Sequence, residues 1–184
     1  KRDLTAVLKR FSKFPAIVLL GPRQSGKTTL VKDTFKKHRY VTLEDPEILE
    51  YITKDPKRFL REYENEHGII FDEFQHAPKL LSYLQIEVDE KDRPGYFVLT
   101  GSQNFLMNQA ITQSLAGRAG ILHLLPLSIN ELSRNKILPN LDELMFQGGY
   151  PRMYARDVVP QELFPSYVRT YVERYVRQLV NVEN

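Results

Sequence analysis

Eight residues near the N-terminus combine the types and the spacing that a polyphosphate-binding loop needs. Residues 21–28, Gly-Pro-Arg-Gln-Ser-Gly-Lys-Thr, match the pattern G-x-x-x-x-G-K-[ST]. In such a loop, backbone N–H groups and a helix N-terminus hold phosphate oxygens, the lysine neutralises the β and γ phosphates, and the hydroxyl ligates Mg²⁺. We therefore expect a nucleoside-triphosphate site made by Gly21, Pro22, Arg23, Gln24, Ser25, Gly26, Lys27, Thr28 and Thr29.

A pair of acidic residues follows an apolar run about 45 residues after this loop. Residues 68–71 are Gly-Ile-Ile-Phe, and Asp72 and Glu73 come next. Mg²⁺ needs carboxylate oxygens near its shell, and an attacking water needs a group that orients it. We predict that Asp72, with Thr28, serves the metal and that Glu73 polarises the water. The competing interpretation is a solvated strand end.

Polar residues also follow a later apolar run, Tyr96 to Leu99. Thr100, Ser102 and Asn104 are candidates for a sensor of the γ-phosphate, and we choose Ser102 first. The alternative is an ordinary strand-to-helix turn with a serine cap.

Two arginines are candidates for contacts with phosphate. Arg118, after Ser114-Leu115-Ala116-Gly117, comes just before an apolar run, where an arginine can project toward a neighbouring subunit's nucleotide. Arg152, after Gly148-Gly149-Tyr150-Pro151, could approach from a lid. The competing interpretations are a surface residue for Arg118 and a Gly-Pro turn for Arg152. The predicted catalytic residues are Glu73, Lys27, Arg118 and Ser102.

The segments that position these residues alternate between strand and helix patterns. Continuous apolar runs, rather than alternating ones, predict parallel strands covered on both faces. We expect strands at 16–20, 40–43, 68–71, 96–99 and 120–124, helices at 4–11, 27–37, within 46–65 and at 80–88, and a polar link at 104–115. From residue 126 onward only helices are expected, at 129–132, 141–146 and 162–179. The predicted domains are a P-loop core at 1–125 and a helical lid at 126–184.

Composition limits the class of protein. The 184 residues include no cysteine and no apolar run of the ~20 residues that a bilayer span requires. No secretory leader pattern is present, so we expect a cytoplasmic protein without a membrane partner. The four histidines show no ligand spacing and are expected to be structural. We interpret the chain as a fragment, because it lacks an initiator methionine and ends within a helical pattern.

Charge is distributed unevenly along the chain. Residues 1–40 carry eleven Lys and Arg against two Asp, whereas residues 41–92 carry fourteen acids against six bases. A basic end can contact nucleic acid. Solvated helix faces beside a phosphate loop explain the same charges more simply.

With these motifs identified, the chain resembles the bacterial and archaeal group of AAA+-type P-loop ATPases whose ATPase domain precedes a C-terminal domain of uncertain function. The matching segments are 21–29, Phe-Asp-Glu-Phe-Gln at 71–75, Leu-Thr-Gly-Ser at 99–102, 114–118, Pro-Leu-Ser at 126–128 and Gly-Gly-Tyr-Pro at 148–151. One departure is Tyr175, where such proteins often carry aspartate.

The resemblance implies an α/β fold with a five-stranded parallel sheet in 5-1-4-3-2 order, helices on both faces and a C-terminal helical lid. It implies ATP rather than GTP, consistent with the lack of an N-K-x-D motif, with Mg²⁺ as cofactor. Partners compatible with it are ATP or ADP, a homo-oligomer, and a nucleic acid or protein bound through the missing domain. The leading function is Mg²⁺-dependent ATP hydrolysis that drives a conformational change. The alternatives are an ATP-gated binding switch with little turnover and a small-molecule kinase. The kinase is disfavoured because no group of Asp or Arg residues that could bind an acceptor follows the second strand.

Overall fold

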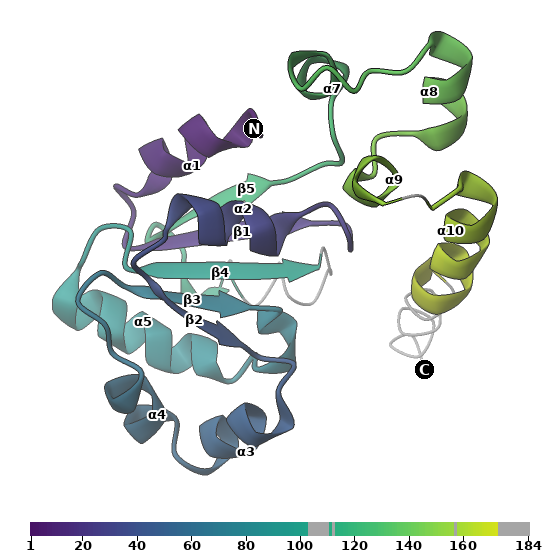
Figure 1. The fold of residues 1–184 in the computed structure, drawn as a ribbon. Coiled ribbons are helices and arrows are strands. Elements are labelled where there is room, and N and C mark those ends of the chain that lie inside the picture. Colours follow the sequence, from purple (N-terminus) through teal and green to yellow (C-terminus); the bar gives the residue numbers. More distant parts are fainter. Residues whose placement is uncertain (103–110, 112, 157, 173–184) are drawn as a thin grey trace. The chain divides into compact units, whose positions relative to one another are not determined.

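The computed structural model describes residues 1–102, 111, 113–156 and 158–172 and divides into two compact units, Lys1–Pro126 and Leu127–Asn184. The first unit contains a five-stranded parallel sheet in the order β2-β3-β4-β1-β5 (Figure 1). This is the predicted 5-1-4-3-2 order read from the other edge. The strands are β1 (Ala16–Gly21), β2 (Arg39–Thr42), β3 (Ile69–Asp72), β4 (Phe97–Ser102) and β5 (Ala119–His123).

The three central strands are buried along their whole length, which explains their continuous apolar runs. Every residue of β1, β3 and β4 is buried. Successive side chains point to opposite faces of a strand. Val18 and Phe71 accordingly pack into one core cluster, and Ile17 and Ile70 pack into the other. Burying one such side chain stabilises the fold by about 1.5–3 kcal/mol.

Helices cover both faces of the sheet, as expected (Figure 1). On one face, Ile52, Phe59 and Leu84 pack from α3 (Pro46–Lys54), α4 (Pro56–Glu62) and α5 (Leu80–Lys91). On the other face, Leu8 and Val31 pack from α1 (Leu4–Phe11) and α2 (Lys27–Thr34).

Proline and aspartate set the starts of two of these helices. Asp45 caps α3 by accepting from the Glu47 N–H, and Asp55 caps α4 by accepting from the Arg58 N–H, each at 2.9 Å. A proline occupies the first turn of both helices, where the missing N–H costs no hydrogen bond.

Some boundaries differ from the sequence prediction. Helix α2 ends at Thr34 rather than at residue 37, because Phe35 leaves the helical conformation and packs into the core. Strand β4 runs to Ser102, so Thr100 and Ser102 lie within the strand rather than beyond it. Most of the expected 104–115 link lies outside the described residues.

The described part of the second unit contains only helices. These are α7 (Ile129–Arg134), α8 (Leu141–Gln147), α9 (Pro151–Ala155) and α10 (Pro160–Tyr167), followed by a π-helical turn at Val168–Val172. Helix α9 was not among the expected helices, and a Gly-Pro turn was the alternative interpretation of the segment that contains Arg152. The remainder of the predicted 162–179 helix, with Tyr175, lies outside the described residues. Among the helices that the structure describes, none combines the length and apolar character needed to cross a bilayer.

Candidate nucleotide site

The phosphate loop connects the carboxyl end of β1 to the start of α2. Gly21 ends β1, and a Cβ at this position would lie 2.2 Å from the carbonyl oxygen of Leu124. Gly26 adopts a left-handed conformation with φ of 92° immediately before α2. The two glycines therefore permit a close backbone contact and a sharp turn that other residues would strain.

Lys27 is buried inside this loop. Its ammonium group donates hydrogen bonds to the carbonyl oxygens of Gly21 and Pro22, each at 3.0 Å. Burial lowers the pKa of Lys27, whereas the nearby carboxylates of Glu73 and Asp72 favour the charged form. The loop thus encloses a cation beside the N-terminus of α2, whose N–H groups have no side-chain cap.

Asp72, the last residue of β3, accepts hydrogen bonds from three hydroxyl groups. Thr28 donates at 2.9 Å, Tyr40 donates at 2.7 Å, and Thr100 donates as well. The aspartate is only 4% exposed. Burial and the hydrogen bond to Asp72 both raise the pKa of Tyr40. The predicted pair Thr28 and Asp72 is therefore in direct contact.

Glu73 directly follows β3 in a strained conformation. Its φ of 56° lies in the left-handed region, which residues with a side chain seldom adopt. Its carboxylate accepts from the Gln75 amide and from the Ser102 hydroxyl, the latter at 3.5 Å. Its backbone N–H donates to the Thr100 hydroxyl at 3.4 Å. Glu73 therefore emerges beside Asp72 with its carboxylate oriented by two donors.

The sensor candidates occupy different places. Thr100 is fully buried and its hydroxyl bonds Asp72 and the Glu73 backbone. Ser102, also buried, contacts the Glu73 carboxylate. Asn104 lies outside the described residues. The choice of Ser102 stays a prediction.

Arg118 lies where the parallel strands begin, at the end of the sheet opposite the loop. Its carbonyl accepts from the N–H of Ala16, the first residue of β1, whereas the loop follows the last residue of β1. At ~3.3 Å per residue, these two points are separated by roughly 16 Å. The guanidinium donates to both carboxylate oxygens of Asp89 on α5, at 3.0 Å for Nη2 to Oδ2. Arg118 therefore does not join the cluster around Lys27 in its own chain.

Comparison with known families agrees with this geometry. A family model described as an AAA domain matches residues 13–133, which is more than half of the chain. The chain belongs to the AAA domain family.

Curated relatives of this AAA domain come from mycobacteria. The uncharacterized proteins Rv2008c of Mycobacterium tuberculosis and Mb2031c of Mycobacterium bovis are each 30% identical to it over 97% of the chain. The chain spans 40% of the length of these relatives. The Walker-type ATPase PABY2304 of Pyrococcus abyssi has a similar fold, with a TM-score of 0.55 and 16% identity over all of this chain and 75% of that one.

Two residues of the AAA domain site escaped sequence reasoning. Tyr40 reaches Asp72 from the neighbouring strand β2, and Gln75 holds Glu73 from within η1 (Phe74–His76). The strand order implied by the resemblance already sets β2 beside β3, but the register of this pair, which brings Tyr40 near Asp72, was not given by the sequence. Arg152 lies in α9 of the second unit, and its role stays a prediction.

Proposed function

We propose that this AAA domain binds ATP with Mg²⁺ at the loop between β1 and α2 and hydrolyses it with the help of Glu73. The observation that carries the proposal is the contact of Thr28 with Asp72 directly beside the buried Lys27. The ends of two strands, β1 and β3, bring a cation, a hydroxyl and two carboxylates close together. The structural neighbour from Pyrococcus abyssi is a Walker-type ATPase, which agrees with this choice of reaction.

The residues of the loop fit a bound triphosphate. The hydroxyl of Ser25 is buried and has no hydrogen-bond partner among the described residues, so the loop holds an unsatisfied polar group. The uncapped N-terminus of α2 also favours an anion. In this proposal, Lys27 exchanges its two carbonyl partners for phosphate oxygens.

Thr28 and Asp72 fit a divalent cation that prefers oxygen ligands. Their oxygens lie 2.9 Å apart, and Tyr40 and Thr100 hold the carboxylate from two sides. When bound, Mg²⁺ neutralises charge that develops on the phosphates. Asp72 and Thr28 would orient it, and Tyr40 and Thr100 would keep the aspartate in place.

Glu73 is the residue that we assign to the attacking water. It stands next to the metal-binding aspartate and is half-buried rather than sealed in the core. Gln75 and Ser102 fix the direction of its carboxylate. The same two hydrogen bonds also favour the second candidate, a binding switch with little turnover, because they occupy one carboxylate oxygen.

Hydrogen bonds within the first unit connect the loop to the segment after β5, which agrees with a driven conformational change. The Leu124 N–H, after β5, donates to the Leu20 carbonyl just before the loop, at 2.7 Å. The Arg2 guanidinium bonds the Ser25 carbonyl of the loop at 2.9 Å and the Pro126 carbonyl at 3.4 Å. We infer that rearrangement of the loop on hydrolysis moves the connection to the second unit, and through it an attached domain or partner.

The substitution Lys27→Ala tests the binding step. Wild-type chain should bind ATP with Mg²⁺ in the roughly 1 μM to 1 mM range typical of enzyme substrates, and the variant should lose most of this affinity because the triphosphate loses its cation. Titration calorimetry measures both. Lys37→Ala, an exposed lysine just after α2, is the matched control and should bind normally. Unchanged affinity in Lys27→Ala would remove the loop from the proposal.

A further inference from the structure

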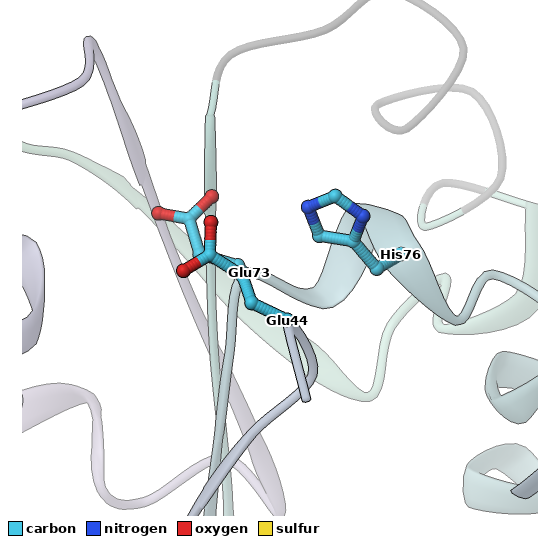
Figure 2. Close-up of side chains that lie close together, drawn as sticks. All are labelled: Glu44, Glu73 and His76. Atoms are coloured by element: carbon cyan, nitrogen blue, oxygen red, sulfur yellow. The ribbon is translucent and has the colours of Figure 1, made fainter. Parts of the chain in front are cut away.

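Three potential metal ligands meet beside the proposed nucleotide site. Glu44, Glu73 and His76 each offer one ligand atom, and these atoms all lie within 4.8 Å of one another. Figure 2 shows the two carboxylates side by side with the imidazole ring of His76 beside them.

The parallel pairing of β2 and β3 explains why these residues meet. Thr42 is in register with Asp72, and the Leu43 N–H donates to the Asp72 carbonyl at 2.9 Å. Glu44, two residues after Thr42, and Glu73, one residue after Asp72, therefore leave the ends of neighbouring strands close together. His76 comes from the 3₁₀ turn η1, three residues after Glu73. The spacing of histidines in the sequence gave no sign of this group, because one ligand belongs to another strand.

The hydrogen bonds that the Glu73 carboxylate accepts occupy one of its two oxygens, which leaves the other oxygen for a cation. Within the described part of the chain, neither the Glu44 carboxylate nor the His76 ring has a hydrogen-bonded or ion-paired partner, and both side chains are exposed. Two carboxylates this close repel each other, and a shared cation relieves the repulsion.

The mixture of ligands selects the kind of cation. Mg²⁺ prefers oxygen ligands, whereas imidazole nitrogen with carboxylate oxygen suits Zn²⁺ and its first-row neighbours. Three protein ligands with an open fourth position are also common at zinc sites that keep a water. We propose that Glu44, Glu73 and His76 bind Zn²⁺ and that this binding withdraws Glu73 from ATP hydrolysis.

The zinc site is distinct from the Mg²⁺ site, although the two adjoin. Asp72 accepts from Thr28, Tyr40 and Thr100, and it is not among the three zinc ligands. Zinc would therefore inhibit by holding Glu73, not by displacing Mg²⁺. The inhibitory part of the inference rests on the proposed function, whereas zinc binding does not.

Zinc binding is tested directly, without nucleotide. Titration calorimetry with ZnCl₂ in a non-chelating buffer should show binding to the full chain. His76→Ala and Glu44→Gln should each weaken it by at least about tenfold, the scale on which even outer-shell changes act. His67→Ala and Glu47→Gln, both exposed and outside the group, are the matched controls and should bind like wild type. A wild-type chain that binds no Zn²⁺, or His76→Ala binding as tightly as wild type, would overturn the site.

Inhibition is tested at saturating Mg²⁺ and ATP with free Zn²⁺ held by a metal buffer. Each variant is compared with its own zinc-free rate. We expect wild type and His67→Ala to lose activity at a free Zn²⁺ concentration that leaves His76→Ala active. Equal inhibition of His76→Ala would overturn the regulatory role. Zinc binding that requires His76 in a chain that hydrolyses no ATP would instead contradict the proposed function and leave the zinc site standing.

Discussion

The central sheet has a carboxyl edge, where its parallel strands end, and an amino edge, where they begin, and the two carry polar residues in different arrangements. At the carboxyl edge, Asp72 gathers three hydroxyl groups next to a buried lysine, and Glu73 stands beside them in a strained conformation. At the amino edge, Arg118 pairs with Asp89 on the surface, and His38 contacts the Gly95 carbonyl. The first arrangement concentrates charge where a ligand would bind, whereas the second satisfies groups within the fold.

The difference matters for the prediction that Arg118 is an arginine finger, a side chain that projects toward the nucleotide of a neighbouring subunit. The strand between Ala16 and Gly21 separates Arg118 from the loop, and this length of roughly 16 Å exceeds the reach of a side chain. A contact between Arg118 and nucleotide, if Arg118 has that role, would therefore have to involve the nucleotide of another chain. The carboxyl edge of one subunit and the amino edge of a neighbour would together make one complete site.

The largest expected effect concerns this sharing. A finger supplied in trans contributes about 10³–10⁵ in rate, so the specific ATPase activity of wild type should rise with protein concentration. Arg118→Ala should abolish the rise. Arg93 also lies just before a strand, β4, and pairs with an acid, Glu64. Arg93→Ala is therefore the control and should keep the rise. A flat wild-type rate per chain, together with normal hydrolysis by Arg118→Ala, would return Arg118 to the role of a surface residue.

The next effect concerns Glu73 at the carboxyl edge. Glu73→Gln should retain ATP affinity and lower turnover by at least about a hundredfold, because water-orienting groups contribute about 10²–10⁴. Calorimetry and steady-state rates measure the two properties separately. Glu66→Gln, an exposed glutamate before β3, is the control. Equal turnover of wild type and Glu73→Gln would favour the binding switch.

A smaller effect is expected at Tyr40. Tyr40→Phe removes one of the three donors that hold Asp72 while keeping the aromatic ring. Groups behind a metal ligand typically contribute 10–100-fold to metal affinity, so we expect the Mg²⁺ concentration for half-maximal ATPase activity to rise by about tenfold. Tyr83→Phe, on α5, is the control. No change in the Mg²⁺ requirement would mean that Thr28 and Thr100 suffice to orient Asp72.

The smallest effect should appear at the amino edge. Burial lowers the pKa of His38 below its usual value, despite the hydrogen bond to Gly95. The folded chain then binds fewer protons than the unfolded chain. The contribution of neutral His38 to the free energy of unfolding is therefore present above pH 6.5 and is lost as the pH falls toward the lowered pKa. His38→Gln should reduce this loss between pH 7 and pH 5 in urea unfolding, without changing ATP affinity at pH 7.5. His123→Gln is the control, and an unchanged pH dependence in His38→Gln would contradict the assignment.

Much of the fold followed from the sequence because the signals were local. Apolar runs such as Ala16 to Leu20 predicted buried parallel strands, and the glycines of the loop predicted the strand-to-helix turn. The resemblance supplied the strand order, which the structure confirms.

What the sequence did not reveal depends on contacts between distant segments. Tyr40 and Asp72 are 32 residues apart, and Arg118 and Asp89 are 29 apart. The extension of β4 through Thr100, Gly101 and Ser102 also escaped prediction, because glycine is a weak strand former and the pairing of Gly101 and Ser102 with β1 is not visible in the local sequence.

The central claim is that one subunit supplies the carboxyl edge and another supplies Arg118. Mixing Arg118→Ala with Glu73→Gln tests it most directly, since each variant retains the part that the other lacks. If the two edges meet between subunits, an equal mixture of two inactive proteins should hydrolyse ATP at about a quarter of the wild-type rate, the fraction of head-to-tail contacts that combine both intact parts. A mixture no more active than the separate variants would contradict the claim.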